Sequence, residues 1–306
     1  MIKSPVLLIG FNRPDTMQQV FEAVRYAQPD KLYYAVDGPR DGRDEEKKVQ
    51  QVRDIIKQVD WQCEVYTLFR EKNVGCGFGP AGAITWAFEK EERLIVLEDD
   101  CVPSQSFFPF CNEMLERYKD DERVNIISGR SHHSRTKFFD NQDYIFTHYA
   151  HTWGWATWKR VWDEFDIYMR DFPEWIAMGG GVNVLATSKI GKSSNHHFAH
   201  IYEHINEEVS HSWDSQWSYT RQKTGGLGIV PCKNLIHNIG DFGTHSFGHN
   251  KVNDLIAEEM PKRLRHPKFI VVNKEYEIFH YNTHINRKQN LLVRALRKLK
   301  REFKKR

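Results

Sequence analysis

Several features of secreted and membrane proteins are missing from this sequence of 306 residues. Its five cysteines are odd in number and form no CxxC pair, which argues against a disulfide framework and a cysteine-rich zinc site. No apolar run approaches the roughly 20 residues that span a bilayer, and the opening MIKSPVLLIGFNRPD becomes polar too early for a signal peptide. We therefore expect a reduced protein in the cytoplasm.

A large net charge is also absent, but the charge is unevenly spread. The net charge is +3, and residues 287–306 hold ten Lys or Arg and one Glu, so this tail carries +9 and leaves −6 for the body (+3 minus +9). Leucines recur at helical spacing among the basic residues, which predicts an amphipathic helix on an anionic membrane surface. Nucleic acid is the competing partner, but no interleaved aromatic residues or known motif accompany the charge, so we expect no nucleic-acid binding. A solubilising or oligomerising helix is the remaining alternative.

Strand and helix signals alternate through the first 130 residues. Short apolar runs typical of buried strands alternate with segments whose apolar residues recur at helical spacing. This order predicts an α/β fold with a mostly parallel, Rossmann-like sheet. Ligands bind such sheets beyond the carboxyl ends of the strands, so the polar residues that follow the strands are candidates for the site. These are Asn12 and Arg13, Asp37, and the triplet Glu98, Asp99 and Asp100.

The acidic triplet closes the segment RLIVLEDD, residues 93–100, directly after a fully apolar run. Like charges packed so closely repel each other, and a cation or a hydroxyl-rich ligand would relieve the repulsion. Hard cations such as Mn²⁺ and Mg²⁺ prefer carboxylate oxygens and keep positions open for a leaving diphosphate. An acidic triplet alone is usually a solvated loop, but the buried strand before it favours a site.

Beyond about residue 130 the alternation stops. The next ninety residues hold seven of the nine tryptophans, with many histidines and glycines between them. Aromatic side chains serve both core packing and stacking on sugar rings, and packing is the commoner role for any one of them. We expect a second lobe here, in which His132 and His133 are structural.

A different function is suggested by GFGPAG, residues 77–82. It fits the GxGxxG pattern of dinucleotide-binding folds and precedes a helix, so an NAD-dependent oxidoreductase is one alternative. A true fingerprint runs straight from a strand into its first glycine. Here the polar REKNVGC intervenes, and Pro80 lies inside the pattern.

Six pieces of the sequence together resemble one enzyme family. They are PVLLIGFNR, the strand closing in Asp37, VLEDD, WGW at 153–155, WDSQW at 213–217 and the later IGDFGTHS. In order and approximate spacing they resemble the inverting GT-A glycosyltransferases related to the N-acetylglucosaminyltransferase that starts complex N-glycans. The resemblance covers residues 5–250. It implies a GT-A fold and the transfer of a hexosyl or N-acetylhexosaminyl group from a nucleotide sugar, with UDP expected, to a hydroxyl of a glycan.

We expect three parts of the chain. Residues 1–130 would be the nucleotide-sugar-binding half, residues 131–286 the acceptor-binding and catalytic lobe of the same domain, and residues 287–306 the basic helix. Such a helix would hold the enzyme at the inner face of the cell membrane, near a lipid-linked acceptor in bacterial surface polysaccharide or glycolipid assembly. An inactive glycan-binding module of the same fold is a further alternative.

The resemblance also implies roles for the donor-side residues. Arg13 would contact the diphosphate, Asp37 the uracil or ribose, and Glu98 and Asp99 the hydroxyls of the donor's sugar and ribose. Asp100 would be the direct ligand of Mn²⁺, or of Mg²⁺. The ordinary alternatives are a surface ion pair for Arg13 and a simple turn for Asp37, since DG is a common turn signal.

The catalytic base implied by the resemblance is Asp214, and Trp213 beside it is expected among the residues that bind the nucleotide-sugar donor. Inversion by a single displacement needs a base opposite the leaving group, on another element than the metal carboxylate. A neighbouring tryptophan would desolvate Asp214 and raise its pKa. The alternative is that Asp214 is a helix N-cap. In the glycine-rich segment 240–249, which matches a lid over the nucleotide, His245 or His249 would contact metal or phosphate.

Overall fold

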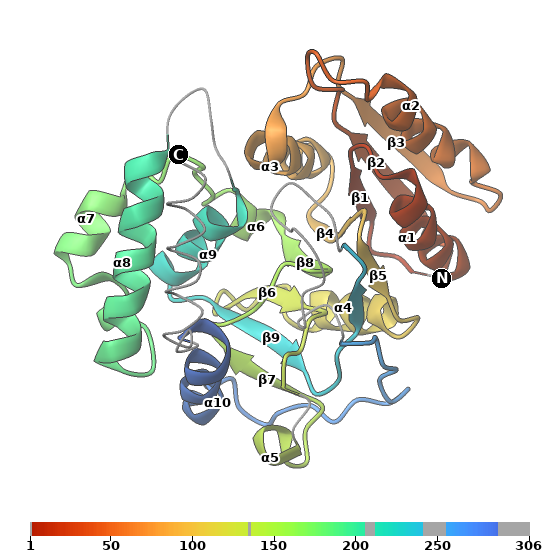
Figure 1. The fold of residues 1–306 in the computed structure, drawn as a ribbon. Coiled ribbons are helices and arrows are strands. Elements are labelled where there is room, and N and C mark those ends of the chain that lie inside the picture. The colour runs from red at the N-terminus through yellow and green to blue at the C-terminus, as the bar shows by residue number, and fades with distance from the viewer. Residues whose placement is uncertain (1, 134–135, 206–211, 241–254, 287–306) are drawn as a thin grey trace, which may run out of the picture.

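A computed structural model describes residues 2–133, 136–205, 212–240 and 255–286 (Figure 1). Within these ranges the chain forms an eight-stranded sheet, flanked by helices, and a separate two-stranded sheet. The eight strands, in their order across the sheet, are β3 (Glu64–Phe69), β2 (Lys31–Val36), β1 (Val6–Gly10), β4 (Arg93–Glu98), β8 (Trp155–Trp158), β6 (Val124–Ser128), β9 (Leu227–Pro231) and β7 (Tyr144–Thr147). The small antiparallel sheet pairs β5 (Cys101–Pro103) with β10 (Ile236–Asn238).

The described part of the large sheet is mostly parallel. β3, β2, β1 and β4 pair in parallel, and β6 and β9 resume that direction after the antiparallel β8. β7 runs antiparallel to β9 at one edge. Strands buried on both faces read as continuous apolar runs, which is why the sequence indicates them clearly. The predicted α/β class with a mostly parallel, Rossmann-like sheet is confirmed.

Helices form where apolar residues recur at helical spacing. α1 (Pro14–Ala27) has proline in its first turn and buries one apolar face. The other described helices are α2 (Glu46–Asp54), η1 (Ile55–Gln58), α3 (Gly75–Phe88), α4 (Phe107–Arg117), α5 (Thr136–Phe139), α6 (Lys159–Trp162), α7 (Phe172–Ala177), η2 (Gly180–Val182), α8 (Ser188–His204), α9 (Asp214–Lys223), α10 (Lys274–His280) and the π-helical η3 (Tyr281–Ile285). In the part of the chain that the structure describes, no helix is both long and apolar enough to cross a bilayer.

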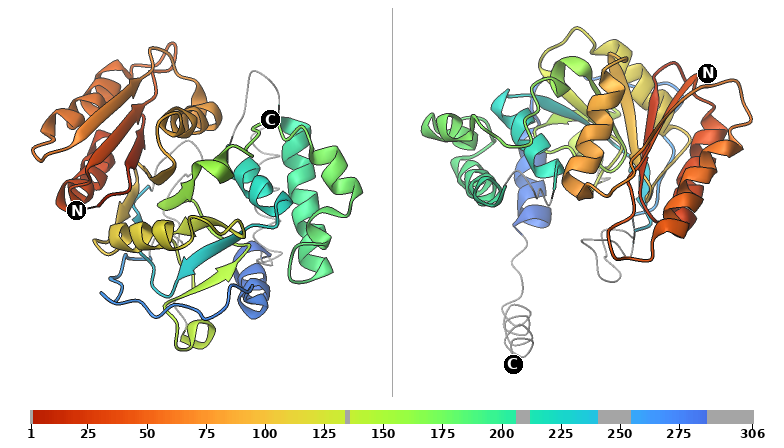
Figure 2. Two further views of the ribbon diagram at one scale, coloured as in Figure 1. Left: turned by 180° about the vertical axis from the view of Figure 1, so that it is seen from behind. Right: turned by 90° about the horizontal axis from the view of Figure 1, so that it is seen from above.

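Helices α1 and α2 lie on one face of the sheet, and α3 lies on the opposite face (Figure 2). Gly10, the last residue of β1, lets α1 and α2 approach the sheet closely. A Cβ atom at this position would lie 2.6 Å from Met17 Cε and 3.2 Å from Val52 Cγ1. The loop that follows β1 therefore starts from a tightly packed point.

The chain beyond residue 130 contributes β7, β8 and β9 to the same large sheet. Its helices α7, α8 and α9 pack around a smaller apolar cluster, whose buried members are Met169, Phe172, Phe198 and Tyr219. This region therefore combines strands of the common sheet with a helical layer of its own. The functional division of the chain at residue 130 stays a prediction.

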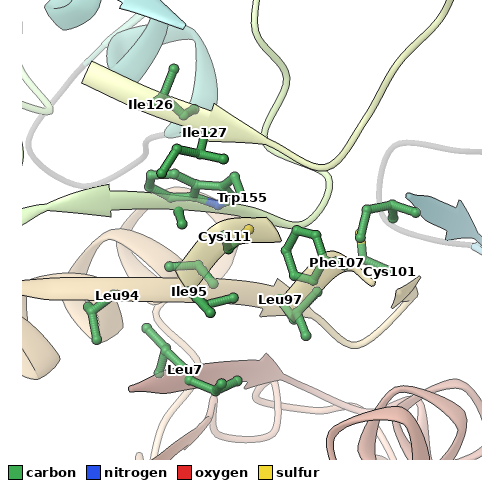
Figure 3. Packing of buried hydrophobic residues seen from close by; sticks show 14 of the residues in the cluster. Leu7, Leu94, Ile95, Leu97, Cys101, Phe107, Cys111, Ile126, Ile127 and Trp155 are labelled. Atoms are coloured by element: carbon green, nitrogen blue, oxygen red, sulfur yellow. The ribbon is translucent and has the colours of Figure 1, made fainter. Parts of the chain in front are cut away.

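Trp155 lies within a group of four buried tryptophans in the main core. Its side chain is fully buried, and its ring centroid lies 5.7 Å from that of Trp213, 5.5 Å from Trp217 and 6.4 Å from Trp162. Figure 3 shows Trp155 in the core together with side chains of β4, β6 and α4. The expectation that most of these tryptophans serve packing holds for the four rings of this group.

We predict that Trp155→Ala lowers the free energy of unfolding by about 3–5 kcal/mol, because truncating a buried tryptophan leaves a large cavity. Urea unfolding followed by circular dichroism measures this change. Tyr26→Ala is the matched control, since Tyr26 is 78% exposed and its loss should change stability by less than about 0.5 kcal/mol. Equal losses in the two variants would contradict the packing role of Trp155.

Candidate active site

Arg13 meets the acidic triplet at the carboxyl edge of the sheet. β1 and β4 pair in parallel, so the loops that follow them leave the same edge side by side. Arg13 occupies the N-cap position of α1, and Asp99 and Asp100 directly follow β4. The register Ile9↔Glu98 brings these two loops into contact.

The Arg13 guanidinium bonds to both aspartates. Its Nε donates to Asp99 Oδ2 at 3.2 Å, its Nη2 donates to Asp99 Oδ1, and its Nη1 donates to Asp100 Oδ2 at 2.8 Å. Burial lowers the pKa of Arg13, but the charges and hydrogen bonds of the two aspartates outweigh burial and raise it overall. The Arg13 side chain is 27% exposed and that of Asp99 5% exposed, so this is a partly buried pair rather than a surface ion pair.

Asp100 is also held from the other side, by β10 and the residues after it. Asn238 Nδ2 donates to Asp100 Oδ1 at 3.3 Å, and the Cys101 thiol donates to the same oxygen at 3.4 Å. The backbone N–H of Ile239 donates to the Asp100 carbonyl at 2.9 Å. Gly240 then passes so close that a Cβ there would lie 2.3 Å from Asp100 Oδ2. The Asp100 carboxylate is thus fixed at the meeting point of three segments.

The acidic triplet carries more negative charge than Arg13 neutralises. Burial, followed by the charges of Asp100 and Asp99, raises the pKa of Glu98 to about 8. Burial also raises the pKa of Asp99, and Arg13 opposes this rise. The donor set of clustered carboxylate oxygens is the one that hard divalent cations prefer, so the residues present fit Mn²⁺ or Mg²⁺.

Asp37 holds the start of α3. Its carboxylate accepts hydrogen bonds from the backbone N–H groups of Gly38 at 2.9 Å, Val74 at 3.2 Å and Gly75 at 3.2 Å. Burial raises the pKa of Asp37, and these N–H donors oppose that rise. The bond to Gly38 agrees with the turn alternative, while the other two join the loop after β2 to the amino end of α3. The predicted contact of Asp37 with uracil or ribose stays a prediction.

The GFGPAG segment lies within α3, and not between a strand and a helix. β3 ends at Phe69 and α3 begins at Gly75, so Gly77 and Gly79 are helical. A Cβ at Gly79 would lie 3.3 Å from Asp37 Oδ2, so this glycine permits close packing. Because a dinucleotide fingerprint places its first glycine in the turn directly after a strand, this geometry argues against the oxidoreductase alternative.

Asp214 is an acidic residue near the triplet that comes from a different element, α9. α9 begins at Asp214, with Trp213 at the N-cap position, so Asp214 is in the first turn and is not itself the N-cap. The Asp214 side chain is exposed, and its charge contributes to the raised pKa of Glu98. It is therefore near enough to interact with the triplet and still open to solvent.

Trp213 faces the core. It is 4% exposed and stacks on Trp155, so it leaves little surface for a ligand. The predicted contact between Trp213 and the donor stays a prediction. The predicted desolvation of Asp214 by Trp213 is not observed, because Asp214 is exposed. Within WDSQW both tryptophans are buried and Asp214 is exposed, because a helix begins there and turns them to different sides.

Two residues of this region were not singled out by sequence reasoning. Cys76, in the first turn of α3, has a pKa raised by burial and then by the charges of Asp214, Glu98 and Asp37, so it lies among all three acids. Asn238 binds Asp100 because β10 pairs with β5. Strands of three residues, such as β5 and β10, are too short to show a pattern in the sequence. Cys76 lies between two glycines, and the sequence gives no sign that acidic residues surround it.

Some predicted residues lie outside the described ranges. His245 and His249 belong to residues 241–254, and the basic tail is residues 287–306. Their proposed contacts with metal, phosphate and membrane stay predictions.

Comparison with known proteins identifies no family. No protein-family model matches the chain, and no curated protein matches it. Solved structures with partial similarity include residues 1–349 of S. aureus TarS, with 8% identity and a TM-score of 0.36 over 54% of this chain and 50% of that one. A mannosyltransferase from Pyrobaculum calidifontis, solved with GDP-Man and Mn²⁺, has 13% identity and a TM-score of 0.39 over 55% of this chain and 48% of its own.

A UDP-glucose pyrophosphorylase solved with UDP-glucose has 10% identity and a TM-score of 0.31 over 54% of this chain and 79% of its own. The matched region spans about half the length of TarS 1–349 and of the mannosyltransferase. At these scores the similarity is partial and does not identify a function.

We predict that metal-free protein loses stability with rising pH because of Glu98. A carboxyl whose folded pKa of about 8 exceeds its unfolded value of about 4.3 stabilises the fold fully below the lower value, and this contribution is lost as the pH rises through about 8. Glu98→Gln should therefore lose less stability than wild type between pH of about 6 and 9 in EDTA, measured by urea unfolding. Glu92→Gln, at an exposed position, should behave as wild type. An unchanged pH slope in Glu98→Gln would contradict the prediction.

We predict that Asp37→Ala destabilises the protein by about 1–3 kcal/mol, because it leaves partly buried N–H donors without an acceptor. Asp37→Asn keeps one carbonyl oxygen and should lose less. Urea unfolding tests both variants, and Asp60→Ala, at an exposed aspartate, serves as the control. A loss in Asp37→Ala no larger than in Asp60→Ala would show that Asp37 does not hold α3.

Proposed function

We propose that this chain is a metal-dependent glycosyltransferase that moves a sugar from a nucleotide donor to a hydroxyl of a glycan. The observation that carries the proposal is the cluster of Glu98, Asp99 and Asp100 at the end of β4, with Asp214 of α9 near enough for its charge to act on Glu98. Ligands of open α/β sheets bind at this edge. The two acidic groups come from different elements, as a metal site and a separate base require.

Asp100 is the proposed metal ligand, with Glu98 beside it. The bonds from Asn238 and Cys101 hold one carboxylate oxygen of Asp100, and Arg13 holds the other. A bound Mn²⁺ or Mg²⁺ would neutralise the negative charge that develops on a departing diphosphate. Arg13 would then share its charge between Asp99 and the diphosphate.

Asp214 is the proposed catalytic base. Its exposure leaves its carboxylate accessible to an acceptor hydroxyl, and its position at the start of α9 keeps it apart from the β4 edge. A base on the face opposite the leaving group gives inversion by a single displacement. Inversion is therefore part of the proposal, and it rests on the separation of Asp214 from Asp100 onto another element.

The donor is proposed to be a UDP-sugar. Glu98 and Asp99 would accept hydrogen bonds from its hydroxyls, and Asp37 would act by holding the loop and the start of α3. The acceptor is proposed to be a lipid-linked glycan or glycolipid in bacterial surface assembly, with the basic tail on the inner face of the membrane. An inactive glycan-binding module would instead keep sugar binding without donor turnover.

We predict that wild type releases nucleoside diphosphate from one member of a panel of UDP-, GDP- and dTDP-sugars, because slow donor hydrolysis needs no acceptor. Release should stop with EDTA and in Asp100→Ala. Asp214→Asn should lower it by about 10²–10⁴-fold, the usual contribution of a general base. A coupled assay for the free diphosphate measures all three.

The control is Asp120→Asn, an exposed aspartate in the turn between α4 and β6, at the opposite edge of the sheet. Full turnover in EDTA would contradict metal dependence. Binding of UDP and Mn²⁺ without release from any donor would favour the inactive module. Stabilisation by NAD alone would restore the oxidoreductase alternative.

A further inference from the structure

A group of histidines lies outside the proposed active site, and three separate segments contribute to it. His132 follows β6, His151 precedes β8, and His284 lies in η3 after α10. The ring centroid of His132 lies 4.3 Å from that of His151 and 4.0 Å from that of His284. Potential ligand nitrogens of these three side chains all lie within 4.8 Å of one another.

We propose that His132, His151 and His284 form a binding site for a divalent transition metal, with Zn²⁺ as the expected ion. Zn–N bonds of about 2.0–2.1 Å in a tetrahedron place ligand nitrogens about 3.4 Å apart, so small side-chain rotations would close the observed group around an ion. Three imidazoles leave one position for water or a fourth ligand. This site differs in chemistry from the carboxylates of the active site, because imidazole suits zinc and carboxylate suits manganese.

Burial lowers the pKa of His132 and of His151, because it disfavours the protonated imidazolium. A metal ion binds the neutral imidazole through a ring-nitrogen lone pair, so the surroundings of these two residues favour the form that a metal ligand needs.

His280 supports the site as a positioning residue. Its Nε2 lies 3.3 Å from His151 Nε2, and its Nδ1 lies 3.2 Å from His133 Nε2. A hydrogen bond at one ring nitrogen of His151 leaves its other nitrogen for the metal, which is the usual arrangement around ligand histidines. The rings of Tyr276 and His280 are nearly parallel, with an interplanar angle of 11°, and this packing fixes the orientation of His280.

The helix that carries His280 is anchored independently of any metal. Glu277 of α10 is fully buried and accepts bonds from the backbone N–H of His148 at 2.7 Å and from the backbone N–H of Ala186 at 3.2 Å. His148 Nδ1 lies 2.8 Å from the same carboxylate. The site is therefore built on a framework that holds its parts in place, and the metal would tie η3 to the ends of β6 and β8.

A second group, His200, Glu203 and His204, provides a matched control. It also brings three possible ligand atoms within 4.8 Å, but all three residues are exposed on α8. Such a pair of histidines one helical turn apart binds metal adventitiously. The proposal predicts tight binding at the half-buried group of His132, His151 and His284 and only weak binding here.

The test uses the full chain, purified without a histidine tag, stripped with a chelator, loaded with Zn²⁺ and freed of loose metal by gel filtration. Wild type and the double variant His200→Ala/His204→Ala should retain about one zinc per chain by mass spectrometry, as a single site requires. His132→Ala/His284→Ala should retain none. His280→Gln should weaken zinc affinity by roughly 10–100-fold, as loss of a supporting hydrogen bond does.

Two further measurements distinguish loss of the metal site from unfolding of a variant. Co²⁺ bound to wild type should give the visible absorption of a tetrahedral nitrogen site, and His284→Ala alone, in the last turn of the described chain, should abolish it. Circular dichroism reports whether each variant is folded. Wild type that retains no zinc, or a folded His132→Ala/His284→Ala variant that retains as much as wild type, would overturn the proposal. Loss of zinc only in His200→Ala/His204→Ala would also overturn the proposal, because it would show that the zinc binds adventitiously on the surface of α8.

Discussion

The repulsion among three consecutive carboxylates at the end of β4 is the constraint on which the site depends. Arg13 neutralises part of this charge and, in doing so, binds the loop after β1 to the loop after β4. β10 contributes a neutral amide, Asn238, and no second cation of its own. Burial raises the pKa of Glu98, and the negative charge that is left raises it further. A divalent ion at this point would complete the balance, so its binding and the fold of the edge are coupled.

The sheet makes this edge possible because it joins two kinds of strand. The parallel strands β1 and β4 deliver the charged loops, and the antiparallel β8 brings Trp155 against α9, whose first residue is Asp214. Trp155, Trp213 and Trp217 therefore act through packing, and they fix α9 relative to β4. The histidine group is likewise formed by residues from remote elements, at the place where the end of β6 and the start of β8 meet η3.

Sequence reasoning recovered the elements that carry their own periodicity. Strands β1, β2 and β4 are buried along almost their whole length, and α1, α2 and α4 show a clear apolar stripe, so these elements could be predicted. The common edge of the parallel strands predicted that Arg13 and the triplet lie at one site, but not that they bond to each other. The burial of Trp213 could not be predicted, because it depends on Trp155 of β8, which is distant in the chain. Asn238 and the histidine group depend on contacts between remote segments, and local patterns carry no record of them.

The most direct test of the central claim is a titration of the protein with Mn²⁺, followed by electron paramagnetic resonance, with and without UDP. The account predicts that each chain binds one Mn²⁺ and that UDP raises the affinity of the protein for this ion. Asp100→Ala should abolish the binding, and His132→Ala/His284→Ala should leave it unchanged. Mn²⁺ binding that is indifferent to Asp100→Ala, or its absence in the presence of UDP, would contradict the assignment of the β4 edge as a metal and diphosphate site.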